Sequence, residues 1–184
     1  ASHTPLFTQL AGEFLQYLMK ERAEGKQTDP AGDPPFLAEL AHYEWVEIGL
    51  RFARDPKIDK LLRPEGDLLS ERPVTSPLAW LLTYHYPVDK IGESFQPDKP
   101  EEQPKHYLVL RNNEMKIKFI SLNLVSARLF ELLRDNPEKT GHDNLLSIAK
   151  EMNHKNPEAI VRNGQTIMQQ WLEKNALLGT LPAI

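Results

Sequence analysis

The regular alternation of hydrophobic and polar residues is clearest in the second half of the chain. Residues 106–111 (HYLVLR) and 115–121 (MKIKFIS) both have the composition of strands. Between them lies Asn112-Asn113-Glu114, a sequence typical of a tight turn. Two strand-like runs separated by such a turn predict an antiparallel β-hairpin.

The second of these strands has two different faces. Met115, Ile117 and Phe119 alternate with Lys116 and Lys118. Because successive side chains of a strand point to opposite faces of the sheet, this alternation predicts one buried face and one face in water.

Three helical segments follow the hairpin, each with a capping signal. Asn123 is suited to cap the first, whose leucine stripe stops at Asn136-Pro137. Thr140 with Asp143 resembles a capping box for the second, and Asn156-Pro157-Glu158 supplies a cap, an N1 proline and an acid for the third. The apolar segment 176–181 is expected to return as a strand. A hairpin with three short helices has the outline of a winged-helix module.

The first half of the chain is predicted to be mainly helical. Apolar residues at helical spacing predict one helix over residues 7–24 and another from the prolines at 34 and 35 to about residue 53. Residues 79–88 are the most strand-like part of this half. Loops are expected at 25–35 and at 96–105, where the latter contains three prolines and no apolar residue.

These elements predict an α+β protein in two parts. We expect a helical domain over residues 1–72 and a winged-helix-like domain over residues 73–184, with a small antiparallel sheet, three helices and the proline-rich loop at 96–105.

The second helix contains a His, two Glu, a Tyr and a Trp in close succession, which raises the question of a catalytic or metal-binding cluster. At 100° per residue, the helix places its expected core stripe at one side, formed by Leu37, Ala41, Trp45, Ile48 and Phe52. His42 and Glu44 lie about 160° apart, so they are unable to hold one metal ion. We therefore interpret His42 as a residue at the rim of a core.

Composition excludes several classes of protein. The 184 residues include no cysteine, which rules out disulfides and thiolate chemistry, and no segment approaches the roughly 20 apolar residues of a membrane span. No signal peptide pattern is present at the start, so a cytoplasmic location is the default expectation. Residues 1–103 carry 11 basic and 18 acidic side chains, and residues 104–184 carry 11 and 8. The resulting excess of three positive charges is far below the usual signature of nucleic-acid binding.

No motif for enzymatic chemistry is present. The chain has no glycine-rich phosphate loop, no nucleophile elbow and no spaced set of metal ligands, and its carboxylates are scattered. His85 lies between Tyr84 and Tyr86 and has no obvious Asp or Ser partner near it in sequence. The sequence thus predicts a protein that is not an enzyme and has no metal or cofactor of its own.

Three segments together resemble one family. PPFLAELAHYEWVEIGL, SPLAWLLTYHYPVDKIG and YLVLRNNEMKIKFISLNLVSARLFELL are similar to the landmarks of HvfC/BufC-type proteins, which older catalogues describe as DNA-binding domains. The resemblance runs from about residue 2 to the C-terminus. It implies a partner of a multinuclear iron enzyme that modifies a ribosomally made peptide, with any iron held by that enzyme. Members of this family usually have a further helical region upstream, so the chain is expected to be truncated at its start.

The final part also resembles the PqqD-like peptide-recognition module, a winged helix that captures a leader peptide. This resemblance implies that the precursor peptide adds as a strand to the sheet edge and rests against the third helix. The residues expected to bind it are Met115, Lys116, Ile117, Lys118, Phe119, Ile160, Gly164 and Met168.

Two other functions remain open at the level of the sequence. A DNA-binding transcriptional regulator would read the duplex with the third helix, through Arg162, Gln165, Gln169 and Lys174. Glu158 and Glu173 on the same helix make it less basic than is typical of such a role. An interaction scaffold that binds neither peptide nor DNA is the other alternative.

Overall fold

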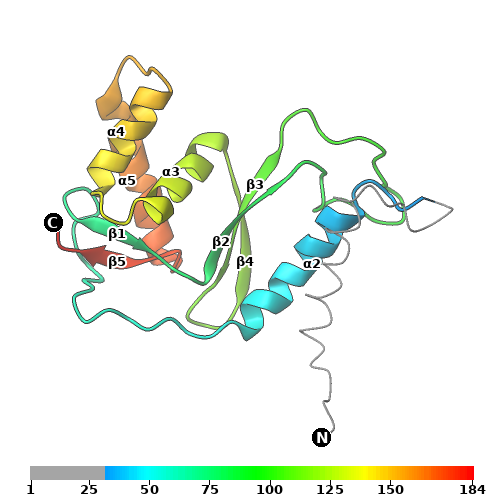
Figure 1. Ribbon diagram of the computed structural model, residues 1–184, viewed down its shortest axis with the longest axis horizontal. Helices are drawn as coiled ribbons and strands as arrows, with labels where there is room; N and C mark the ends of the chain where they lie inside the picture. The colour runs from blue at the N-terminus through cyan, green and yellow to red at the C-terminus, as the bar shows by residue number, and fades with distance from the viewer. Residues whose placement is uncertain (1–31) are drawn as a thin grey trace, which may run out of the picture. The chain divides into compact units, whose positions relative to one another are not determined.

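The computed structural model describes residues 32–184, so the helix predicted over residues 7–24 lies outside the described part of the chain. The described residues form an α+β protein with four helices, a three-stranded sheet and a two-stranded sheet (Figure 1). The elements in chain order are α2 (Leu37–Phe52), β1 (Arg72–Thr75), β2 (Ala79–Tyr84), β3 (Lys105–Arg111), β4 (Ile117–Leu122), α3 (Leu124–Asp135), α4 (Gly141–Glu151), α5 (Pro157–Glu173) and β5 (Leu177–Leu181).

The chain divides into two compact units, and each unit contains two separate segments. Among the described residues, unit one comprises 32–52 and 83–105, and unit two comprises 53–82 and 106–184. These boundaries differ from the expected division after residue 72. The chain enters unit one for the second time within β2 and leaves it at the start of β3.

The three helices of unit two begin at the predicted caps. Asn123 Oδ1 accepts a hydrogen bond from Ser126 N at 2.8 Å, Thr140 Oγ1 accepts one from Asp143 N at 3.1 Å, and Asn156 Oδ1 accepts one from Ala159 N at 3.2 Å. These side chains satisfy backbone donors that a helix leaves without partners in its first turn.

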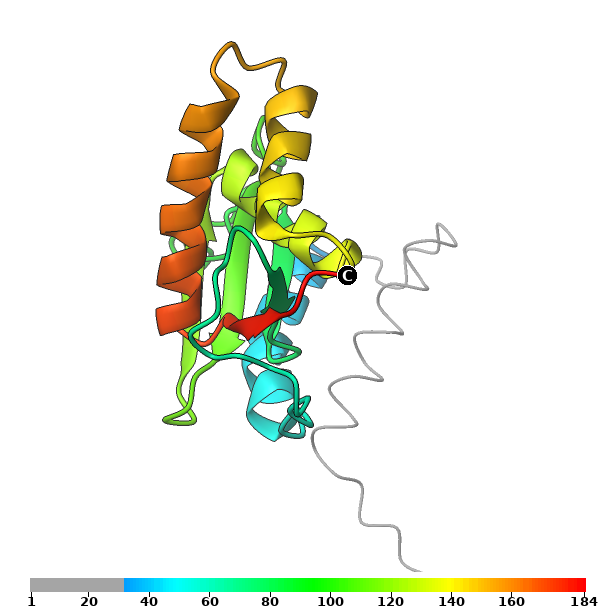
Figure 2. The same ribbon diagram turned by 90° about the vertical axis from the view of Figure 1, so that its left-hand side faces the viewer.

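The core of unit two lies between the three helices and one face of β3. Phe130 of α3 packs edge-on against Trp171 of α5, with ring centroids 5.5 Å apart. Leu108 and Leu110 of β3 are fully buried in the same cluster. Burial of each large apolar side chain contributes on the order of 1.5–3 kcal/mol. Helices α4 and α5 lie side by side and antiparallel (Figure 2).

A second, two-stranded sheet also belongs to unit two. β5 forms from the apolar segment 176–181, as predicted, and pairs antiparallel with β1, so that Arg72 lies opposite Leu181. β1, which is only four residues long, was not predicted from the sequence. Glu71, just before β1, accepts hydrogen bonds from both Thr180 of β5 and Arg63.

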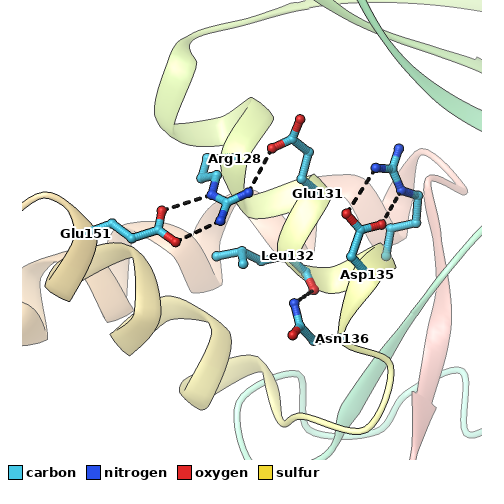
Figure 3. Close-up of polar contacts among 7 residues, drawn as sticks. Arg128, Glu131, Leu132, Asp135, Asn136 and Glu151 are labelled. Carbon is cyan, nitrogen blue, oxygen red and sulfur yellow. Dashed lines mark hydrogen bonds and ion pairs between the residues drawn. The ribbon is translucent and has the colours of Figure 1, made fainter.

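An arginine links α3 to α4 on the surface of unit two (Figure 3). The Arg128 guanidinium donates from Nε and Nη2 to the two carboxylate oxygens of Glu151, at 2.9 and 2.8 Å, and from Nη1 to Glu131 at 3.1 Å. These hydrogen bonds raise the pKa of Arg128 and lower the pKa of Glu151.

Unit one consists of α2 and the segment 83–105. The expected core stripe of α2 is wrong: Val46 and Leu50 are its buried residues, whereas Ile48 and Phe52 are 40% and 68% exposed. Apolar residues occur on nearly every side of this helix, so periodicity alone did not identify the buried side. The proline-rich stretch forms neither helix nor strand until β3 begins at Lys105. Lys105 Nζ forms an ion pair with Asp89 Oδ1 at 3.3 Å.

Candidate functional site

β4 is one of the two outer strands of the three-stranded sheet, and β2 is the other. The strand order is β2-β3-β4, and β3 and β4 pair antiparallel in the predicted hairpin, with Leu108 opposite Ile120. β4 starts at Ile117 rather than at 115, because Met115 occupies the turn with a φ of 62°. Met115 and Lys116, both expected on the edge strand, thus lie in the turn that leads into it.

Two backbone hydrogen bonds determine which residues of β4 face the open edge. Asn112 N donates to the carbonyl of Lys116 across the turn, and Arg111 N donates to Leu78 O on the β2 side, both at 3.0 Å. Neighbouring residues of a strand bond to opposite sides in an antiparallel ladder. The backbone groups of β4 that point away from β3 are therefore those of Ile117, Phe119 and Ser121.

The side chains of β4 do not divide as expected. Ile117 and Phe119 are half-buried on one face, but Ile120 and Leu122 on the other face pack against the core of unit two. Lys118 is exposed and shares the second face. The alternation in 115–119 predicted the exposed lysines and missed the change of pattern beyond Phe119.

Helix α5 runs in the opposite direction to β4 (Figure 2). Near the helix N-terminus, Ile160 lines a hollow together with Asn123 and Val125, which follow β4. Just beyond its C-terminus, Asn175 Oδ1 lies 3.4 Å from the backbone N of Asn113 in the hairpin turn. The chain just before β4 and the chain just after it therefore approach opposite ends of α5.

The hollow between α5 and the start of α3 has a volume of about 330 Å³. Its apolar lining consists of Val125, Leu129, Leu145, Ile148, Ile160 and Ile167. Asn123, Ser126 and Asn163 supply its polar positions, and Gly164 forms part of its wall. An apolar cavity of this size accommodates one or two apolar side chains of a ligand.

The three residues of α5 expected to bind a peptide have different environments. Ile160 is half-buried and lines the hollow, and Gly164 is buried against Leu145. Met168 has no exposed surface and belongs to the core cluster, so it does not line the hollow. Ile167, one turn before Trp171 on the same helix, does line the hollow.

The residues considered for DNA binding all lie exposed on or just after α5. Arg162, Gln165 and Gln169 share one side of the helix, and Lys174 follows its last turn. Gln165 and Gln169 lie with Glu173 around a shallow depression on this polar side. The acidic side chain of Glu173 thus lies among the residues considered for DNA binding.

The histidines of unit one have partners that are distant in sequence. His42 Nδ1 lies 2.9 Å from the Tyr84 hydroxyl, and burial lowers the pKa of His42. The Glu39 carboxylate accepts backbone hydrogen bonds from His85 and Tyr86 at 2.9 and 2.8 Å, and lies 3.2 Å from His85 Nδ1. Glu39 thus connects the first turn of α2 to the chain after β2.

Neither a candidate metal site nor a candidate membrane span occurs among residues 32–184. Within this range, no three His, Asp or Glu side chains are grouped so that they could hold a metal ion. None of the helices in the same range is long and apolar enough to cross a membrane.

Comparison with protein families identifies the chain. The HvfC C-terminal domain family matches residues 76–172, more than half of the sequence. This protein therefore belongs to the HvfC family, as the resemblance of its three segments indicated. The matched range contains β4, the hollow and nearly all of α5. Comparison with curated proteins gives no match.

Proposed function

We propose that this chain is a non-catalytic partner protein in the maturation of a ribosomally synthesised peptide. It binds the leader segment of the precursor peptide and docks on a multinuclear iron enzyme that carries out the modification. Membership of the HvfC family supports a role beside another protein. The observation that carries the proposal is the outer position of β4 next to the apolar hollow on α5.

Strand addition at β4 follows from the direction of its backbone groups. A peptide in extended conformation would form hydrogen bonds with the outward N–H and C=O groups of Ile117 and Ser121. At the Leu122 end of the strand, an apolar side chain of this peptide would reach the hollow lined by Val125 and Ile160. Backbone bonds then supply affinity, and the hollow supplies selectivity.

Docking on the enzyme is assigned to the helical part of the chain. Residues 1–103 carry the acidic excess, with 18 acidic and 11 basic side chains. A charged surface of this kind favours a basic partner and accelerates association.

Ser121 provides the sharpest test of strand addition. Its side chain is exposed and its N–H points outward, so Ser121→Pro removes a donor without breaking the ladder to β3. We expect fluorescence anisotropy with the labelled precursor peptide to show affinity reduced about tenfold, the equivalent of one to two lost hydrogen bonds.

Ser121→Ala is the matched control, because it keeps the N–H and should leave affinity within about twofold. Ile160→Ala should weaken binding by shortening a wall of the hollow, whereas Gln165→Ala on the polar side of α5 should not. Equal affinity of the Pro and Ala variants at position 121 would exclude the β4 edge as the binding strand.

The same titration with random duplex DNA at two salt concentrations separates the regulator from the peptide-binding protein. DNA binding that weakens steeply with salt, without a peptide signal, would contradict the proposal and identify a nucleic-acid ligand. The exposed residues Arg162, Gln165, Gln169 and Lys174 would then be the first to substitute.

A further inference from the structure

A second hollow of unit two lies at the other end of β4, beside the hairpin turn. Its volume is about 440 Å³, and four stretches of chain meet around it: 55–58, 76–78, 111–115 and 175–178. Apolar side chains form part of its wall, namely Ile58, Leu78, Met115 and Leu178. Ile58 and Met115 are 58% and 57% exposed, so its rim is open to solvent.

Among the described residues, Arg111 of β3 is the cationic side chain in the wall of this hollow. Its side chain is 3% exposed, and its guanidinium donates to the carbonyl of Ala53 at 2.6 Å and to the carboxylate of Asp55. A buried guanidinium is strongly unfavourable without an anion beside it. Asp55 supplies that anion, but its side chain is 81% exposed.

The two partners of this ion pair are held very differently. Arg111 is fixed by the sheet, by burial and by the carbonyl of Ala53, whereas Asp55 lies on an irregular segment and reaches the guanidinium from the solvent side. Because the Asp55 carboxylate is already largely exposed, moving it fully into water changes its solvent exposure little. Another carboxylate can therefore take its position while Arg111 remains in place.

Two amide side chains line the hollow near the guanidinium. Asn112 Oδ1 accepts hydrogen bonds from the backbone N of Glu114 and of Lys116, and Asn175 Oδ1 accepts one from Asn113 N. With the oxygens engaged, the NH₂ groups of Asn112 and Asn175 donate no hydrogen bond to any described residue. Neutral donors that line the same hollow as a guanidinium are groups that can complete recognition of a carboxylate.

We propose that this hollow is a binding site for a carboxylate carried by a small apolar group, and that Asp55 occupies the guanidinium of Arg111 when the site is empty. The ligand carboxylate bonds to Arg111 and to the amides of Asn112 and Asn175, and its apolar part contacts Leu178 and Met115. An acidic side chain and a peptide C-terminus both carry this chemistry. The proposal does not depend on strand addition at β4.

The test is a titration of the full chain followed by ¹⁵N NMR. The probes are N-acetyl-leucine, which has a terminal carboxylate, N-acetyl-aspartate α-amide, which has a side-chain carboxylate, and N-acetyl-leucinamide, which has none. We expect saturable shifts of the Arg111 Nε–H signal and of the Asn112 and Asn175 NH₂ signals with at least one acid, and none with the amide. The tighter acid identifies the source of the carboxylate.

Asp55→Asn distinguishes exchange from a purely structural ion pair. If Asp55 occupies the guanidinium nine-tenths of the time, its removal raises the apparent affinity for the acid about tenfold. Asp59→Asn is the matched control, because Asp59 lies on the same segment, accepts a hydrogen bond from Leu61 N and does not line the hollow. It should leave affinity unchanged.

Three results would overturn the proposal: no saturable shift with either acid, equal shifts with the amide, or unchanged or weaker acid binding by Asp55→Asn. The first two are measured on the unsubstituted chain, so they remain decisive if the variant does not fold. The peptide titrations of the Ser121 variants, by contrast, test only the proposed strand addition.

Discussion

The Nδ1 atom of His42 lies 2.9 Å from the hydroxyl oxygen of Tyr84, which joins the middle of α2 to the end of β2 within unit one. The imidazole also stacks on Trp45, with ring centroids 6.1 Å apart, and the ring of Tyr43 meets Tyr84 edge-on at 5.9 Å. His42 thus belongs to an aromatic cluster that holds α2 to the end of β2.

This cluster predicts a loss of stability in mild acid. Burial lowers the pKa of His42, and the nearby Glu39 opposes the effect only in part. The folded state therefore favours the neutral imidazole: its stabilisation is complete above the usual histidine pKa of about 6.5 and is lost as pH falls below it. His42→Gln should reduce the decrease in thermal midpoint between pH 8 and pH 5.

His154→Gln is the control for this measurement, since His154 is exposed and its ring contacts only the adjacent backbone of Asn156. It should show the pH dependence of the unsubstituted protein. An unchanged decrease in the His42 variant would assign the acid sensitivity to other groups. Tyr84→Phe should lower the free energy of unfolding by about 0.5–1.5 kcal/mol at neutral pH.

The link between α3 and α4 predicts a small, salt-sensitive contribution. Arg128 and Glu151 are 42% and 44% exposed, so solvent screens their interaction despite its two parallel hydrogen bonds. A double-mutant cycle with Arg128→Gln and Glu151→Gln should give a coupling of at most about 1 kcal/mol, decreasing in 1 M salt. A coupling of several kcal/mol would show that the pair is shielded from water.

This pair also responds to acid with a definite sign. Arg128 lowers the pKa of Glu151, so the carboxylate stabilises the fold above the usual glutamate pKa of about 4.3 and loses that effect as pH falls below it. The coupling measured in the cycle should therefore decrease as the pH falls below that value and Glu151 becomes protonated.

A side chain at position 164 should lower the stability of the protein, because α4 and α5 are closely packed there. A Cβ at this position would lie 2.0 Å from Leu145 Cδ2, and Leu145 is 1% exposed. We expect Gly164→Ala to destabilise the protein by about 1–3 kcal/mol in denaturant unfolding, although alanine favours helix. Thr166→Ala, at an exposed position of α5, is the comparison and should be neutral or stabilising. A stabilised Gly164→Ala would mean that Leu145 can move aside.

The two-stranded sheet predicts that the last strand is essential to unit two. Leu177 of β5 is 1% exposed and belongs to the core cluster. Leu177→Ala should lower the free energy of unfolding by about 2–5 kcal/mol. Leu181→Ala, at a half-buried position of the same strand, should have a clearly smaller effect. Equal effects would indicate that β5 contributes through its backbone rather than through Leu177.

Local signals in the sequence predicted most of unit two. The caps at Asn123, Thr140 and Asn156 each act within a few residues, so the sequence contains all the information that they need. The hairpin likewise depends on a short turn between two strand-like runs. These elements were predicted correctly, with an error of two residues at the start of β4.

Contacts between distant residues account for what the sequence did not reveal. β1 is recognisable only through its pairing with β5, and Glu39 meets His85 only because α2 and the chain after β2 belong to one unit. The partnership of Arg111 with Asp55, 56 residues earlier, has no local signature either. The edge strand β4 was predicted from the sequence. The hollow beside Arg111, at one end of that strand, was not.

The separation of β1 from β5 along the chain affects how the protein is made. Arg72 is synthesised long before Leu181, its partner in the small sheet. At 5–20 residues per second, a ribosome needs roughly 5–20 s to cover that interval. During those seconds β1 has emerged without its only strand partner in the described structure, and β2 and β3 complete their pairing first. Unit two therefore closes only after β5 has been synthesised, and chaperones have their main opportunity to act on the nascent chain before that point.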